Sequence, residues 1–198
     1  MPRRTRADMI EDTRARLLAA GREAFGRRGY AQASMDDFTA GAGLTRGALY
    51  HHFGDKQGLL AAVVAQIDAE MDARLRAISA AAPDAWTGFS ERCRAYLQMA
   101  QEAEIQRLVL QDARAVLGAT TAVSQQQCIG SMQGMLQDLM DAGVVRQVDA
   151  AALARMLYGA LAEAAGWIAQ EEYGQARLHQ ALGALEVMLQ GIQVTETR

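Results

Sequence analysis

Residues 34–53 read SMDDFTAGAGLTRGALYHHF, and they carry the strongest structural signals in the chain. Ser34 and Asp37 have the spacing of a capping box, in which a hydroxyl and a carboxylate cap the first turn of a helix reciprocally. Glycines at 41 and 43 indicate the end of that helix, and Thr45 is a suitable N-cap for a second one. The stretch therefore predicts two short helices joined by a tight turn.

The sequence on both sides of this stretch is also helical in pattern. Before it, apolar residues at three- and four-residue spacing predict a helix over 8–28, with Ile10 on its inner face and Gly29 as its stop signal. After it, an apolar pattern runs from Asp55 until Pro83, which cannot continue a helix. Further helices are expected over 84–103, 105–117, 120–142, 149–172 and 175–193. No segment alternates with period two, so we predict an all-α fold of about nine helices.

Charge is distributed unevenly along the chain. Residues 1–60 hold 10 Lys and Arg against 7 Asp and Glu, whereas residues 61–198 hold 10 against 16, for an overall net charge of −3. A basic head on an acidic body suits a protein that approaches a polyanion such as DNA with one end. We expect two domains, a helix-turn-helix head over 1–56 and a helical domain over 57–198.

Composition limits the classes of protein to consider. No apolar run is long enough to span a bilayer and no secretory signal opens the chain, so we expect a cytoplasmic protein without a membrane partner. Cys93 and Cys128 lack CxxC or Cys/His spacing, which argues against zinc and disulfides, and we expect both thiols to be buried and inert. Adjacent His51 and His52 point about 100° apart on a helix and cannot chelate one ion together. We predict no metal and no cofactor.

The second short helix has the composition of a helix that enters the major groove. Thr45, Arg46 and Gly47 fall at its N-terminal end, where Arg46 can pair with guanine and small side chains let the backbone approach bases. Tyr50 suits a phosphate contact or packing against the first helix, and Lys56 a phosphate contact or a solvated surface position. The candidate DNA-contacting residues are Ser34, Thr45, Arg46, Gly47, Ala48, Tyr50, His51 and Lys56. Arg3, Arg4 and Arg6 form either a DNA-contacting arm or a solvated tail.

Residues 10–64 resemble the TetR family of transcriptional repressors. The resemblance rests on Ala42-Gly43-Leu44, on Leu49-Tyr50-His51-His52-Phe53 and on the lysine three residues later, Lys56. Gly29-Tyr30 fits the same pattern. The chain departs from it in the first short helix, where Phe38 and Thr39 replace the usual isoleucine and alanine.

The resemblance implies a homodimer on palindromic operator DNA, released by a small hydrophobic inducer. The last two predicted helices suit the dimer interface, for which the candidates are Leu153, Met156, Leu157, Ala160, Ala164, Ile168, Leu178, Leu182, Leu185 and Met188. The middle helices would form the inducer pocket, and the long helix from Asp55 would transmit its occupancy. The pocket candidates are Trp86, Phe89, Cys93, Tyr96, Met99, Leu108, Gln111, Met132 and Leu136, which suit an ordinary core equally well.

Other classes of function have less support in the sequence. An enzyme is disfavoured because the chain lacks HExxH, GxSxG and GxxxxGK[ST] motifs and places no histidine near either cysteine. A helical protein-interaction module and a transcriptional activator without inducer binding remain as alternatives. The sequence does not identify the inducer.

Overall fold

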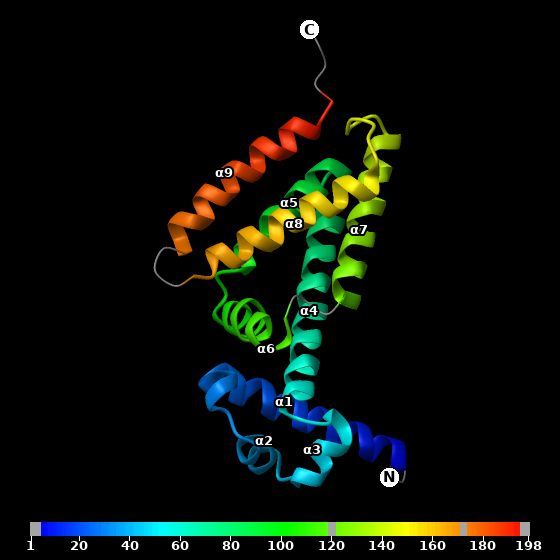
Figure 1. The fold of residues 1–198 in the computed structure, drawn as a ribbon. Helices are drawn as coiled ribbons and strands as arrows, with labels where there is room; N and C mark the ends of the chain where they lie inside the picture. Colours follow the sequence, from blue (N-terminus) through cyan, green and yellow to red (C-terminus); the bar gives the residue numbers. More distant parts are fainter. Residues whose placement is uncertain (1–4, 119–121, 171–173, 195–198) are drawn as a thin grey trace. The chain divides into compact units, whose positions relative to one another are not determined.

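A computed structural model describes residues 5–118, 122–170 and 174–194. Across these residues the chain forms nine α-helices and one π-helical segment, η1 (Figure 1). In chain order they are α1 Arg6–Gln32, α2 Met35–Ala42, α3 Arg46–Phe53, α4 Lys56–Ala81, α5 Ala85–Met99, η1 Ile105–Ala113, α6 Arg114–Leu117, α7 Ala122–Asp141, α8 Ala150–Ile168 and α9 Gly174–Ile192. The all-α prediction is confirmed, and the β pairing of the described residues is an isolated bridge between Val145 and Gln193.

The helix-end signals around α2 and α3 act as predicted. The Ser34 hydroxyl accepts the Asp37 amide at 3.3 Å, and the Asp37 carboxylate accepts the Ser34 amide at 2.8 Å. Gly43 ends α2 with a φ of 60°, in the left-handed region that favours glycine. Thr45 caps α3 by accepting the Ala48 amide at 3.3 Å. These contacts join residues three positions apart, so the sequence alone is enough to predict them.

Three expected helices differ from the structure. The predicted helix 84–103 ends at Met99, because the next three amides bond to carbonyls three residues back. The predicted helix 105–117 is π-helical in its first nine residues and becomes α-helical only at Arg114. The predicted helix 149–172 ends earlier, at Ile168, with Ala169 as its C-cap. Thr120, Glu172, Arg3 and Arg4 lie outside the described residues.

The chain divides into two compact units. Unit 1 comprises residues 1–67 and 107–119, and unit 2 comprises residues 68–106 and 120–198. Helix α4 is continuous and contributes its first part to unit 1 and the remainder to unit 2. The grouping of residues 107–119 with the head was not predicted from the sequence. The functional boundary between residues 56 and 57 remains a prediction.

The core of unit 1 forms where α1, α2 and α3 pack together. Phe25 of α1 and Phe38 of α2 are fully buried, with ring centroids 4.9 Å apart. Phe38, where the family usually carries isoleucine, is therefore accommodated by an aromatic pair. Ile10, expected on the inner face of α1, is 44% exposed, and the first buried residue of α1 is Leu17, so the start of this helix is not covered by the other described elements.

Residues 107–117 make specific contacts within unit 1. The Asp112 carboxylate accepts the Tyr30 amide at 2.8 Å, and the Gln57 side chain donates to the Val116 carbonyl at 3.3 Å. The Arg107 guanidinium covers Gly29, where an added Cβ would lie 2.6 Å from Nη2. Gly29, the predicted stop of the first helix, has a φ of 74° and interrupts the regular backbone of α1. Glycine is needed here for its positive φ, because the flexible end of the Arg107 side chain could shift to admit a Cβ.

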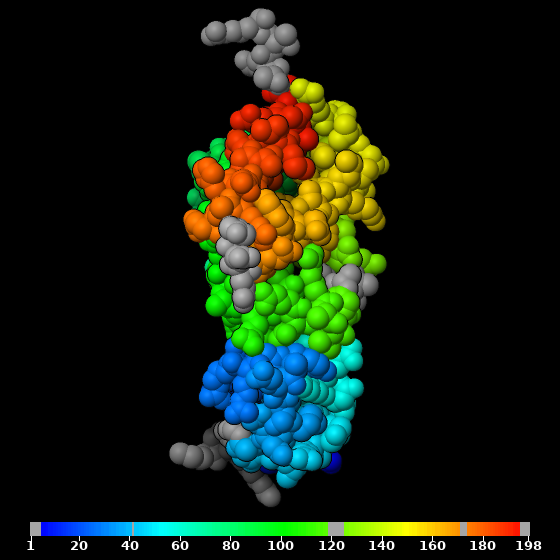
Figure 2. All heavy atoms as spheres, turned by 60° about the vertical axis from the view of Figure 1, so that its left-hand side comes forward, coloured from blue at the N-terminus to red at the C-terminus, as the bar shows by residue number. Residues whose placement is uncertain are grey.

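Unit 2 is built from packed helices α5, α7, α8 and α9. On the face shown in Figure 2, α8 in yellow and α9 in orange and red lie side by side. The Arg94 side chain of α5 donates to Glu186 of α9 at 2.5 Å. Cys93 is buried as expected, but Cys128 is exposed, so the expectation of two buried thiols was wrong for Cys128. None of the described helices combines the length and apolar character that crossing a membrane requires.

Candidate nucleic-acid interface

The turn between α2 and α3 is held from both sides. The Leu44 amide donates to the Thr39 carbonyl at 2.9 Å, which closes the chain around Gly43. From α1, Arg16 donates to the Ala42 carbonyl at 2.5 Å and so satisfies an acceptor that the end of α2 leaves unpaired. Arg16 was not predicted from the sequence, because no local signal links it to a residue 26 positions away. The contact ties the C-terminal end of α2 to α1.

The first turn of α3 is open to solvent. Thr45, Arg46 and Gly47 are exposed, Ala48 is half-buried, and Leu49 is buried beneath them. The first amides of a helix have no partner within it and favour an anion in front of them. The fold therefore holds Leu49 in the core and presents the predicted base-reading residues together on one accessible surface.

The predicted phosphate-contacting residues differ in their surroundings. Tyr50 and His51 are exposed on α3, with Tyr50 at 55%. The Lys56 ammonium lies 4.4 Å from the centre of the Tyr30 ring, a cation–π distance. The Ser34 hydroxyl is engaged with Asp37, and its hydrogen bonds lower the pKa of that carboxyl. Ser34 thus has a structural role beside the DNA contact predicted for it.

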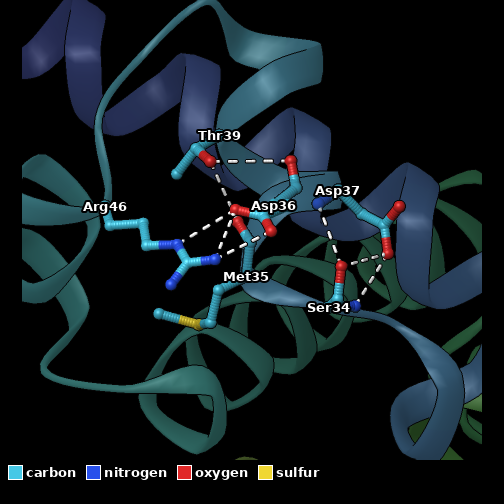
Figure 3. A network of polar contacts seen from close by, with 6 residues as sticks. All are labelled: Ser34, Met35, Asp36, Asp37, Thr39 and Arg46. Atoms are coloured by element: carbon cyan, nitrogen blue, oxygen red, sulfur yellow. Dashed lines mark hydrogen bonds and ion pairs between the residues drawn. The ribbon is translucent and has the colours of Figure 1, made fainter.

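Arg46 forms an ion pair that sequence analysis did not anticipate (Figure 3). Its Nε donates to Asp36 Oδ1 at 3.0 Å, and its Nη2 lies 2.7 Å from both carboxylate oxygens. The hydrogen bonds and charge of Asp36 raise the pKa of Arg46. The pair joins the start of α2 to the start of α3, and the only sequence signal for it was an acidic residue in the first turn of α2.

The inducer-pocket candidates are distributed between the units. In unit 2, Phe89, Cys93, Met99 and Leu136 are buried, and Trp86, Tyr96 and Met132 are half-buried. Leu108 and Gln111 belong to unit 1, where Leu108 is buried and Gln111 is exposed. Ser90 of α5 was not among the predicted pocket residues, and its buried hydroxyl has no hydrogen-bond partner within the described part of the chain.

The dimer-interface candidates fall into two groups on α8 and α9. Met156 and Met188 are exposed, at 73% and 41%. Four candidates are buried within the chain itself, namely Leu157, Ile168, Leu178 and Leu185. The remaining four are half-buried: Leu153, Ala160, Ala164 and Leu182. Val187, which sequence analysis did not single out, is 70% exposed on α9.

A three-helix head with a capped, exposed second short helix, joined to a larger helical unit, defines a helix-turn-helix transcriptional regulator. Residues 17–63 match the model of bacterial regulatory proteins of the tetR family, and residues 86–192 match that of the tetracyclin repressor-like C-terminal domain. The chain belongs to the tetR family.

Known relatives agree with this assignment. A TetR-family transcriptional regulator from Pectobacterium atrosepticum is 62% identical, with a TM-score of 0.91, over 97% of this chain and 99% of its own. The HTH-type transcriptional regulator TtgR of Pseudomonas putida is 38% identical over 77 residues, 39% of this chain and 36% of its own, so the match spans about a third of that relative. SmeT, the repressor of the Stenotrophomonas maltophilia multidrug efflux pump SmeDEF, is 21% identical over 93% of this chain and 94% of its own, with a TM-score of 0.73, and shares the fold.

Proposed function

We propose that this chain is a ligand-responsive repressor that binds a palindromic operator as a homodimer. The observation that carries the proposal is the exposed first turn of α3, with Arg46 and Gly47 at the surface above buried Leu49. In helix-turn-helix proteins the N-terminal residues of this helix contact base edges in the major groove. Arg46 has the donors that guanine O6 and N7 require, whereas Tyr50 and Lys56 suit phosphates.

Dimerisation is supported by apolar side chains on the surface of unit 2. Met156 of α8 and Val187 of α9 are each at least 70% exposed. Gly159 and Gly183 on the same helices are also exposed, and a Cβ added at either would meet nothing within 4 Å. Exposed apolar side chains beside small residues favour close helix packing against a second copy. The resulting twofold axis would set the two α3 helices about 34 Å apart, one turn of DNA.

The ligand site is proposed in unit 2, among the buried and half-buried side chains of α5 and α7. Phe89 and Leu136 supply apolar surface, and Trp86 lies beside Phe89 with ring centroids 6.3 Å apart. The Ser90 hydroxyl supplies a buried polar group whose hydrogen-bonding capacity is unused. Small-molecule sites combine such an apolar lining with a few polar groups. Continuous helix α4 would then transmit ligand binding to the head.

The test is a selection of genomic DNA fragments by the purified full-length protein at near-physiological salt. We expect an enriched inverted repeat, with Arg46→Ala weakening binding to it roughly 5- to 100-fold while leaving random-sequence binding nearly unchanged. Arg27→Ala is the matched control, because Arg27 is an exposed arginine paired with Glu23 on α1. Enrichment of no sequence by a folded dimer would overturn the DNA-reading proposal and favour a protein-interaction module.

A further inference from the structure

The ion pair between Asp36 and Arg46 lies on the surface that α3 presents to DNA. Both side chains are exposed, Arg46 at 62% and Asp36 at 70%, so neither is held in place by burial. The carboxylate contacts the guanidinium along one edge, through Nε and Nη2. The partner of the arginine, Asp36, lies in the first turn of α2, two residues after the Ser34 cap, so the helix fixes the backbone from which its carboxylate extends.

The edge that Asp36 uses is not the edge that reads a base. A guanidinium has five N–H donors in a planar fork, and the outer pair of donors, on Nη1 and Nη2, is sufficient for a bidentate contact. In Figure 3 the Asp36 oxygens meet Nε and Nη2, while the third nitrogen points away from the carboxylate. The outer edge of Arg46 therefore remains available for guanine O6 and N7.

The ion pair with Asp36 also makes Arg46 better suited to reading a base than to contacting phosphates of any sequence. The adjacent carboxylate offsets the positive charge of the arginine, so its attraction to any phosphate is reduced. An ordered side chain loses less conformational freedom when it binds, provided that the base matches its orientation. Guanine offers two acceptors to the outer edge, whereas adenine offers one acceptor and a competing donor. Both effects favour base reading over nonspecific phosphate contact.

We propose that Asp36 is a positioning residue for base reading, which holds Arg46 so that it selects guanine at one position of each operator half-site. This inference rests on the proposed function, since it needs Arg46 to face a base. Asp36 contacts no DNA itself in this arrangement and acts through the orientation and charge of Arg46.

The experiment measures relative affinities for a DNA library in which each operator position is randomised in turn. The full-length protein is compared with Arg46→Ala, Asp36→Asn and the double variant. Glu23→Gln is the matched control, because it removes one carboxylate from another exposed arginine pair of unit 1, with Arg27 at 3.4 Å. Circular dichroism verifies that each variant is folded.

We expect Arg46→Ala to abolish a guanine preference at one half-site position, and Asp36→Asn to reduce it about two- to fivefold, as the loss of an exposed ion pair allows, while strengthening binding to random DNA. The double variant should match Arg46→Ala alone at that position, and Glu23→Gln should keep the full preference. An unchanged guanine preference in Asp36→Asn overturns the inference, even if affinity rises for all sequences, because the pair would then act only through its charge. If the unsubstituted protein shows no sequence preference, the proposed function fails and the inference with it.

Discussion

Replacement of Phe38 by alanine tests how unit 1 is held together. The ring is fully buried and packs against Phe25 at a centroid distance of 4.9 Å. Phe→Ala substitutions in cores typically cost about 3–5 kcal/mol, of which an aromatic pair accounts for about 0.5–1.5 kcal/mol. Because domains are stable by only about 5–15 kcal/mol, a loss of this size should bring unit 1 near its unfolding threshold. Phe38→Leu keeps the site apolar and mostly filled, so it should cost less.

The two tryptophans allow the units to be followed separately. Trp86 and Trp167 are the only tryptophans in the chain, and both belong to unit 2. In urea, Phe38→Ala should show an early loss of helical circular dichroism, while the tryptophan fluorescence transition stays near that of the unsubstituted protein. Phe38→Leu should unfold between the two. A circular dichroism midpoint that Phe38→Ala leaves unchanged would refute the packing argument, because the ring would then contribute nothing to unit 1.

Three further predictions concern DNA binding, assembly and thiol chemistry. Lys56→Gln should reduce the magnitude of the slope of log affinity against log salt concentration by about 1.8 per dimer, because each phosphate contact contributes about 0.9 to the slope and a dimer has two Lys56 side chains. An unchanged slope would show that Lys56 contacts no phosphate. Met156→Asp should convert the dimer to monomer in sedimentation at micromolar concentration, because a charge cannot be buried unpaired at an interface, whereas Met9→Asp in unit 1 should not; a Met156→Asp dimer would exclude this residue from the interface. Burial raises the pKa of Cys93 from 9.0 to about 12, so a thiol reagent near pH 8 should modify exposed Cys128 in the native protein and Cys93 only after unfolding. Since the unfolded state loses its Cys93 proton first, the stability that this residue contributes should fall as the pH rises from about 9 towards 12, and rapid native labelling of Cys93 would contradict its burial.

Helix ends and the helix-turn-helix were predictable because their causes are local. The hydrogen bonds of the Ser34 cap and the Thr45 cap span three residues, and Gly43 acts through its own backbone conformation. Each can be read from residue type and spacing. The predicted bounds of α2 and α3 consequently agree with the structure to within about a residue.

Burial on the outer helices was less predictable, because an apolar pattern does not say what will cover it. Helix α8 carries apolar residues on several sides, and the structure buries Leu157 while leaving Met156 exposed. Cys128 and Ile10 were misjudged for the same reason, since their exposure depends on which neighbouring elements reach them. A helical period identifies a face, but its partner comes from another part of the chain.

The sequence by itself determined that this protein is all-α, where its helix-turn-helix lies, and which residues begin the helix proposed to read DNA, because short-range caps, glycines and periodicity specify these features. Only the tertiary structure decided that Asp36 holds Arg46, that Arg16 fixes the end of α2, and that Asp112 binds the amide of Tyr30. These contacts join residues 10, 26 and 82 positions apart. They exist because packed helices bring distant side chains within hydrogen-bonding distance, and no local pattern encodes that proximity.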